Sequence, residues 1–205
     1  MMADGPSANL PPHIWLEPAL LFSRSLKLAV LALGLLPAAC DRQARDPAQG
    51  APADGAAIPV RGSFDRGHRG SAMPDMTFAG ANGQQLELGS LKGRPVLINL
   101  WATWCAPCVT ELSTLENLAA SGKVRVVTIS QDSGAPDQVT AFLQQRRFTR
   151  LQPWQDPQNN LSFHYNTGTL PTTVLYDSKG REVWRYVGEH DWASPEAAAA
   201  IAQAN

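Results

Sequence analysis

The sequence predicts an α/β fold with a central mixed sheet flanked by helices. Two apolar runs, at 96–101 and 124–130, are typical of strands buried in the middle of a sheet. Each run is followed by a segment of helical character, at 107–120 and 136–145. A two-stranded hairpin and a helix then close the chain. The fold class follows from this order, a β-α-β half followed by a hairpin and a helix.

Turn residues and helix caps define the remaining elements. The Asn82-Gly83 pair separates two short segments and predicts an N-terminal β-hairpin ahead of the first apolar run. Gly122 ends the helix at 107–120, because glycine readily adopts the left-handed conformation that follows many helices. Three further elements are each bounded by a turn or a cap: a short helix at 161–165, a hairpin of 172–176 with 182–187, and a closing helix that starts after Ser194.

We expect three parts in the chain: a leader with a signal sequence at 1–40, a flexible tether at 41–72 and a folded domain at 73–205. Within the leader, basic residues precede a short apolar run and then small residues, which is typical of a secretory signal. An uncleaved anchor or a buried helix is the alternative, although the run is shorter than the roughly 20 residues that span a bilayer. The tether is rich in Ala, Gly, Pro, Asp and Arg and has no apolar periodicity.

The apolar run ends in Ala38-Ala39-Cys40, which resembles the lipobox where bacterial lipoproteins are acylated and cleaved. Pro37 departs from that motif, which usually carries leucine at this position. The resemblance implies a lipid anchor on Cys40, and Asp41 directly behind it implies retention at the inner membrane. Several acyl chains would anchor the protein firmly.

Composition narrows the classes of function. The 17 Lys and Arg residues balance 18 Asp and Glu residues, so there is no electrostatic reason to expect nucleic acid as a partner. Three cysteines are too few for a scaffold stapled by disulfides. Two of them, Cys105 and Cys108, form a CxxC pair directly after the first apolar run, so we expect the chemistry at this place.

The segment Trp104-Cys105-Ala106-Pro107-Cys108 predicts thiol–disulfide exchange. Cys105 opens a helix, where unpaired N–H groups and the helix dipole stabilise a thiolate. Cys108 follows one turn later on the same face, so we expect Cys105 to attack a substrate and Cys108 to resolve the mixed disulfide. A fixed disulfide or a zinc half-site is the alternative. Zinc needs about four ligands and the sequence offers no second pair, so we expect no metal and no cofactor.

The sequence LINLWATWCAPC, which ends at Cys108, resembles the active-site strand and loop of the TlpA/ResA/CcmG group of thioredoxin-fold proteins. Glu111 and the segment Gly168-Thr169-Leu170-Pro171-Thr172 match the same group, and the resemblance covers 73–202. It implies a thioredoxin fold. It also implies a periplasmic, membrane-tethered thiol–disulfide oxidoreductase that supplies electrons to cytochrome assembly.

The resemblance further implies how a substrate meets the cysteines. The bond before Pro171 is expected to be cis and to face them, which is rare enough that the resemblance alone carries this expectation. The backbone of Leu170 could pair with an extended substrate. We also expect substrate contacts at Trp104, Ala106 and Pro107, with packing alone as the alternative for Trp104.

Proton handling is expected to differ from that of thioredoxins. These proteins carry a buried Asp six residues before the first cysteine, where this sequence has Asn99. We therefore expect Glu111, three residues after Cys108, to act as the proton acceptor. A favourable charge near a helix N-terminus, without a catalytic role, is the alternative for Glu111.

These observations favour an enzyme that reduces protein disulfides in the periplasm. Strong oxidants of this fold tend to carry histidine between their cysteines, and here Ala106-Pro107 stands there. The resemblance implies apocytochrome c or copper-site proteins as substrates and a membrane electron donor of the CcdA or DsbD type. A general periplasmic disulfide reductase, a copper-handling protein and an inert tethered module are the alternatives. Copper binding would favour extra His or Met near the pair, and 105–111 contains neither.

Overall fold

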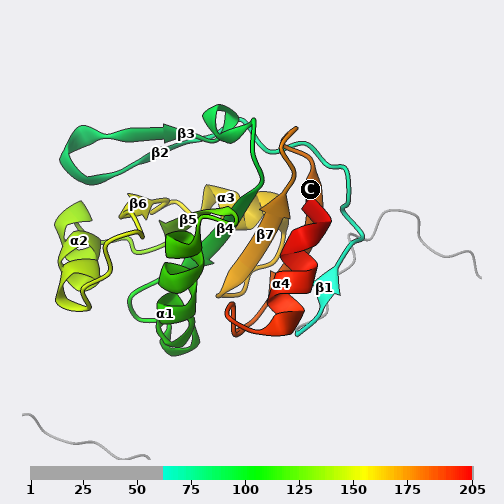
Figure 1. Ribbon diagram of the computed structural model, residues 1–205. Helices are drawn as coiled ribbons and strands as arrows, with labels where there is room; N and C mark the ends of the chain where they lie inside the picture. Colours follow the sequence, from blue (N-terminus) through cyan, green and yellow to red (C-terminus); the bar gives the residue numbers. More distant parts are fainter. Residues whose placement is uncertain (1–61, 205) are drawn as a thin grey trace, which may run out of the picture. The chain divides into compact units, whose positions relative to one another are not determined.

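The computed structural model describes residues 62–204, which form a sheet flanked by helices (Figure 1). The predicted leader, with Cys40, and the first two thirds of the predicted tether lie outside the described residues. Among the residues that are described, no helix combines the length and the apolar character needed to cross a bilayer.

The described residues form an eight-stranded sheet in the order β1-β8-β7-β4-β5-β6-β2-β3. Its strands are Phe64–Asp65 (β1), Thr77–Ala79 (β2), Gln85–Glu87 (β3), Val96–Trp101 (β4), Arg125–Ser130 (β5), Trp154–Gln155 (β6), Thr172–Tyr176 (β7) and Glu182–Val187 (β8). Strand β5 pairs in parallel with β4 and β6, and the other pairs are antiparallel. The sheet is therefore mixed, as the sequence predicts.

Within 62–204 the chain forms four α-helices: Ala106–Ser121 (α1), Pro136–Gln145 (α2), Asn160–Tyr165 (α3) and Pro195–Ile201 (α4). The caps expected from the sequence are present. Gly122 follows α1 with a φ of 68°. The Ser194 hydroxyl accepts the N–H of Ala197 at 3.1 Å, which satisfies an otherwise unpaired donor at the start of α4.

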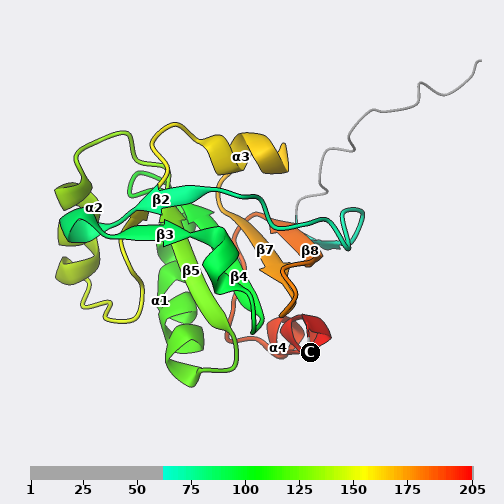
Figure 2. The same ribbon diagram turned by 90° about the horizontal axis from the view of Figure 1, so that it is seen from above.

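Two apolar cores lie on opposite faces of the sheet. Side chains alternate along β4, so Leu97 and Trp101 join the core beneath α1, α2 and α4, whereas Ile98 and Leu100 join the core beneath α3. Figure 2 shows α3 on one side of the sheet and α1 and α4 on the other. Buried on both faces, β4 is uniformly apolar except for Asn99.

The prediction that 41–72 is a flexible tether is wrong for its last part, which joins the sheet. Phe64–Asp65 pairs with β8, and Ala72 forms an isolated bridge with Arg181. The Phe64 ring packs edge-on against Trp184, with 4.8 Å between ring centroids. The folded domain therefore begins before Met73, the predicted boundary. A two-residue strand anchored by one aromatic side chain has no periodicity for sequence analysis to detect.

The segment around Asn82-Gly83 joins the edge of the main sheet. Asn82 and Gly83 both have positive φ, 56° and 74°, in the turn between β2 and β3, where Ala81–Gly83 forms a short 3-10 helix. Strands β2 and β3 pair on either side of this turn, and Ala79 also pairs with Gln155 of β6. Strand β6 is absent from the sequence prediction because it has only two residues.

Candidate active site

The two cysteines lie where the central strand passes into α1. A three-residue loop follows β4, and Cys105 is the N-cap of the helix. The Cys105 and Cys108 sulfurs form a disulfide, with 5.3 Å between the Cα atoms. The backbone N–H of Cys108 points at Cys105 Sγ, with 3.3 Å between N and S. In the reduced protein this N–H and the helix dipole would stabilise a thiolate on Cys105.

The two cysteines differ in accessibility. Cys105 keeps 7% of its surface exposed and borders a groove, whereas Cys108 is fully buried at 0%. A substrate disulfide can therefore reach Cys105 before it can reach Cys108.

The groove beside Cys105 has a volume of about 800 Å³. It brings together four residues that the sequence singles out as substrate contacts: Trp104, Ala106, Pro107 and Leu170. Trp104 is 70% exposed, so packing alone does not account for it. The first turn of α1 forms one part of the wall, and α3 with the loop after it forms another.

The loop that carries Leu170 and Pro171 is held in place by hydrogen bonds. The Leu170–Pro171 peptide bond is cis, as the resemblance implies. The Thr172 hydroxyl donates to the Thr169 carbonyl at 2.7 Å, and the N–H of Gly188 donates to the Pro171 carbonyl at 2.9 Å. Pro171 itself is buried and is not among the residues that line the groove.

Glu111 lies on the buried face of α1, one turn after Cys108, and is 2% exposed. Its Oε1 accepts from Asn99 Nδ2 at 2.7 Å. Its Oε2 accepts from the backbone N–H of His190 at 3.0 Å and from Trp192 Nε1 at 3.2 Å. The carboxylate thus joins α1 to β4 and to the segment between β8 and α4.

Burial raises the pKa of Glu111 from 4.5 to about 7, although the hydrogen bonds from His190, Asn99 and Trp192 oppose the shift. The charge of Glu189 raises it slightly further. Asn99 Oδ1 has no hydrogen-bond partner, so an Asn99 amide turned by 180° could accept a hydrogen bond from the protonated Glu111 carboxyl. Both protonation states of Glu111 can therefore be accommodated near neutral pH.

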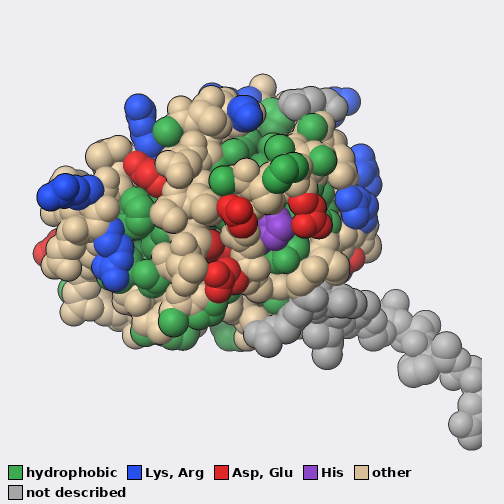
Figure 3. Space-filling view, turned by 60° about the horizontal axis from the view of Figure 1, so that its bottom comes forward, with side chains coloured by type: hydrophobic (Ala, Val, Ile, Leu, Met, Phe, Trp, Pro, Cys, Tyr) green, Lys and Arg blue, Asp and Glu red, His purple; other side chains and the backbone are tan. Residues whose placement is uncertain are grey.

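The segment above Glu111 has an acidic surface. Glu189 and Asp191 flank His190 in the chain, and Figure 3 shows Asp and Glu side chains gathered around a histidine. Burial lowers the pKa of His190, although Glu196 and Asp191 oppose the shift. The side chain of His190 packs against Tyr186 and Trp192. Only its backbone N–H bonds to Glu111.

Several residues of the site, among them Gln131, Asp132 and Phe163, are absent from the sequence prediction. Gln131 and Phe163 line the groove. The Asp132 carboxylate accepts from the Thr103 N–H at 3.0 Å and from the Thr103 hydroxyl at 2.6 Å, which fixes the loop just before Trp104. Gln131 and Asp132 directly follow β5, parallel to β4. Polar residues at the carboxyl ends of adjacent parallel strands are a signal that could have identified these two.

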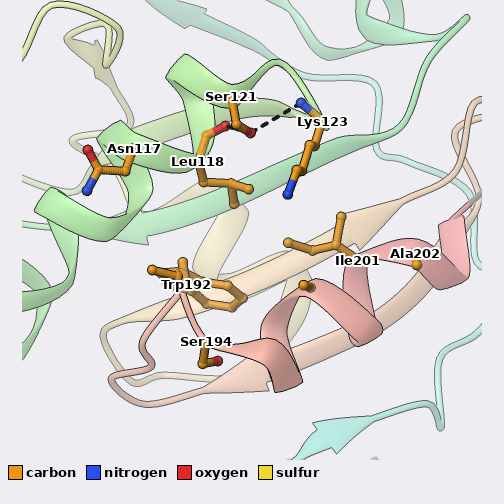
Figure 4. Close-up of a pocket in the computed structure, with 10 residues that line it drawn as sticks. Asn117, Leu118, Ser121, Lys123, Trp192, Ser194, Ile201 and Ala202 are labelled. Atoms are coloured by element: carbon orange, nitrogen blue, oxygen red, sulfur yellow. Dashed lines mark hydrogen bonds between the residues drawn. The ribbon is translucent and has the colours of Figure 1, made fainter.

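A second hollow, of about 450 Å³, lies between the end of α1 and α4 (Figure 4). In this view the side chains of Leu118, Trp192 and Ile201 point toward one another. Leu118 is 13 positions after Cys105, or roughly 20 Å along a helix. The hollow is therefore separate from the site at the cysteines. Among residues 62–204, no group of three or more His, Cys, Asp or Glu side chains is placed to hold a metal ion.

The thioredoxin-like sheet and the CxxC disulfide at the start of α1 define the class of the thioredoxin-fold thiol–disulfide oxidoreductases. A family model described as Redoxin matches residues 68–201, more than half of the chain, and the chain belongs to this family.

Curated relatives carry names of the same class. The chain is 33% identical over 115 residues to the thioredoxin-like protein YneN of Bacillus subtilis, which is 54% of this chain and 66% of the relative. It is 31% identical over 104 residues to the thiol:disulfide interchange protein DsbE of Xylella fastidiosa, 51% of this chain and 52% of the relative. It is 29% identical over 121 residues to the thiol-disulfide oxidoreductase ResA of Bacillus anthracis, 58% of this chain and 70% of the relative. The chain thus spans half to about two thirds of these relatives.

Solved structures share the fold. A Chlorobium tepidum protein assigned as a thiol:disulfide interchange protein DsbE is similar with a TM-score of 0.57 and 26% identity, covering 66% of this chain and 96% of that one. A secreted disulfide oxidoreductase of Mycobacterium tuberculosis has a TM-score of 0.53 and 21% identity, covering 62% of this chain and 95% of that one. The second likeness concerns the fold alone.

Proposed function

We propose that the chain reduces disulfides of other proteins outside the cytoplasm, with Cys105 as the nucleophile and Cys108 as the resolving thiol. The observation that carries this proposal is the difference in exposure between the two cysteine residues. Cys105 borders an open groove at the start of a helix, and Cys108 is buried behind it. This is the arrangement that an attacking and a resolving thiol need.

The reaction begins with both cysteines reduced. The Cys105 thiolate attacks one sulfur of a substrate disulfide, the substrate S–S bond breaks, and the released substrate thiolate takes up a proton. Cys108 then loses its proton and attacks Cys105 Sγ, which breaks the mixed disulfide and releases the second substrate thiol. Two electrons have passed to the substrate, and the protein is left with the Cys105–Cys108 disulfide that the structure contains.

Glu111 is the group proposed to accept the Cys108 proton. It is buried one turn further along α1, and its pKa of about 7 suits proton exchange near neutral pH. Water reaches Cys108 poorly, because the residue is fully buried. A carboxylate on the same helical face therefore offers a route for the proton that solvent does not.

The proposal also covers the substrates, the electron donor and the location of the protein. The resemblance to the TlpA/ResA/CcmG group favours apocytochrome c or copper-site proteins as substrates and a CcdA- or DsbD-type membrane donor that reduces the Cys105–Cys108 disulfide again. A lipid anchor on Cys40 would hold the domain at the outer face of the inner membrane. The relatives named as oxidoreductase and interchange proteins support the chemistry.

Equilibrium titration of the full chain against glutathione and dithiothreitol tests the direction of electron flow. We expect a potential nearer the about −270 mV of thioredoxin than the about −120 mV of a strong oxidant. A parallel assay would follow reduction of insulin by the reduced chain, with Cys105→Ala as the inactive control. A potential above about −180 mV would instead indicate an isomerase or an oxidase.

A further inference from the structure

In the part of the chain that the structure describes, exposed aromatic side chains concentrate at one place. Among residues 62–204 the large hydrophobic side chains that are exposed are Trp104, at 70%, and Phe163, at 76%. Both line the groove that Cys105 borders. A single exposed hydrophobic side chain is ordinary on a protein surface. Two exposed aromatic side chains that line the groove beside the reactive disulfide indicate a binding surface.

The exposure of Phe163 is imposed by the packing of α3. Leu161 and Tyr165 are buried in the core beneath this helix. Phe163 is two positions from each of them, and two positions turn a helix by about 200°. With its neighbours fixed in the core, the Phe163 side chain must point away from the sheet.

Hydrogen bonds fix both ends of α3, so the backbone that carries Phe163 is well ordered. At the start, the Asp156 carboxylate accepts the N–H groups of Asn160 and Leu161 at 3.0 and 2.8 Å. At the end, Arg185 Nη1 donates to the Tyr165 carbonyl at 2.6 Å. An anchor that is already ordered loses little conformational freedom when a partner binds.

Apart from the Cys105 thiolate of the reduced protein, the groove carries no charged side chain. None of its lining residues is Asp, Glu, Lys, Arg or His. Apart from Trp104, Cys105 and Phe163, they are Ala106, Pro107, Gln131, Asn159, Ser162, Asn166, Gly168, Thr169 and Leu170. The amides of Gln131, Asn159 and Asn166 can bond to a polypeptide backbone, whereas a charged side chain would lose water without gaining a counter-charge.

We propose that Phe163, together with Trp104, selects substrates in which an apolar, uncharged side chain lies close to the reactive cysteine of an extended polypeptide segment. The proposal rests on the proposed function, because the disulfide in the groove requires that the occupant bring a cysteine. Phe163 and Trp104 contact the apolar side chain, and the amides contact the backbone beside it. Large aromatic side chains are the residue types that most often dominate binding at such surfaces.

The test uses the reduced full chain and two synthetic peptides that differ only in the residues two positions before and after a central cysteine. One peptide carries Leu at both positions and the other carries Asp, and each cysteine is joined to 5-thio-2-nitrobenzoate. Stopped-flow release of the chromophore gives the rate of attack by Cys105. We expect the Leu peptide to react about tenfold faster than the Asp peptide, both at low salt and at 0.5 M NaCl.

Phe163→Ser is expected to bring the ratio of the two rates close to one. His164→Ser is the matched control: His164 is the next residue of α3, is also exposed and borders a different hollow. It should retain the tenfold ratio. Circular dichroism would verify that both variants are folded.

Equal rates for the two peptides with the unchanged chain, or a ratio that survives Phe163→Ser, would overturn the inference. A preference that disappears in 0.5 M NaCl would overturn it too, because it would come from charge repulsion at a distance. Reduction of 2-hydroxyethyl disulfide, which has no flanking side chains, is measured in parallel. If this small disulfide is reduced, failure of the peptide test leaves the proposed function intact. If it is not, the proposed function fails and the inference fails with it.

Discussion

Replacing Glu111 with Gln should change both the stability and the reaction rate of this protein, each with a characteristic pH dependence. The carboxyl has a pKa of about 7 in the folded protein, mainly because of burial, against 4.5 in the unfolded chain. At a pH between these two pKa values, Glu111 is protonated in the folded protein and ionised in the unfolded chain. The free energy of unfolding therefore falls as the pH rises from about 4.5 to 7, by about 3 kcal/mol in all.

Glu111→Gln removes this dependence, because glutamine does not ionise. The glutamine oxygen can still accept the N–H groups of His190 and Trp192, and its amide can donate to Asn99 Oδ1 once the Asn99 amide has turned by 180°. Urea unfolding at pH 5 and pH 8 would measure the effect. The unchanged protein should lose stability between the two pH values, and the variant should lose less. Glu87→Gln, an exposed carboxyl on β3, is the matched control and should behave like the unchanged protein.

The same substitution should slow resolution of the mixed disulfide, because Cys108 loses its proton acceptor. We expect a fall of at most about 10²–10⁴-fold, the usual contribution of general-base catalysis. In stopped-flow measurements from pH 5 to pH 9, the rate of the unchanged protein should rise as Glu111 ionises near pH 7. A variant that keeps both the rate and the pH profile would refute this reasoning. Glu111 would then only join α1 to its neighbours, and water would take the proton.

Three further predictions concern other parts of the chain. Mass spectrometry of the membrane-extracted protein should find an acylated mature N-terminus at Cys40, and an unmodified Cys40 behind another N-terminus would exclude the anchor. Glu116→Ala should destabilise the fold by about 1 kcal/mol, because this carboxylate accepts the N–H groups of Thr149, Arg150 and Leu151. Burial opposes these hydrogen bonds, which together lower the pKa of Glu116. The destabilisation by Glu116→Ala should therefore be largest above about pH 5 and become smaller as the pH falls. A destabilisation that does not depend on pH would show that the charge of Glu116 is not involved. Trp104→Ser should slow insulin reduction more than reduction of 2-hydroxyethyl disulfide, and equal slowing would show that Trp104 does not contact protein substrates.

Most of the fold could be predicted because its signals are local. The strand at 96–101, the CxxC pair and the helix after it follow one another along the chain, and buried strands are apolar on both faces. Strands β1 and β6 could not be predicted. Each has two residues, too few to show a periodicity, and each is held by hydrogen bonds to a neighbouring strand.

The residues of the site also fall into two groups, those that local sequence signals predict and those that only tertiary packing brings to the site. The prediction could place Cys105, Cys108 and Glu111 on one helical face, because their spacing along α1 is enough. The partners of Glu111 on the 190–192 segment lie about 80 positions further along the chain and meet it only in the folded protein. Phe163 also reaches the groove through tertiary packing, because the core positions of Leu161 and Tyr165 determine where it points.

Trapping of mixed disulfides tests the central claim most directly. In a Cys108→Ala variant the attacking thiol is present and the resolving thiol is missing, so a substrate should remain bound to Cys105. Incubation with a protein disulfide, quenching with acid and non-reducing mass spectrometry should detect a covalent adduct at Cys105. Cys105→Ala should give little or no adduct, because Cys108 is fully buried. Adducts that form equally well at Cys108 would contradict the assigned order of attack, and the absence of adducts from both variants would contradict disulfide exchange itself.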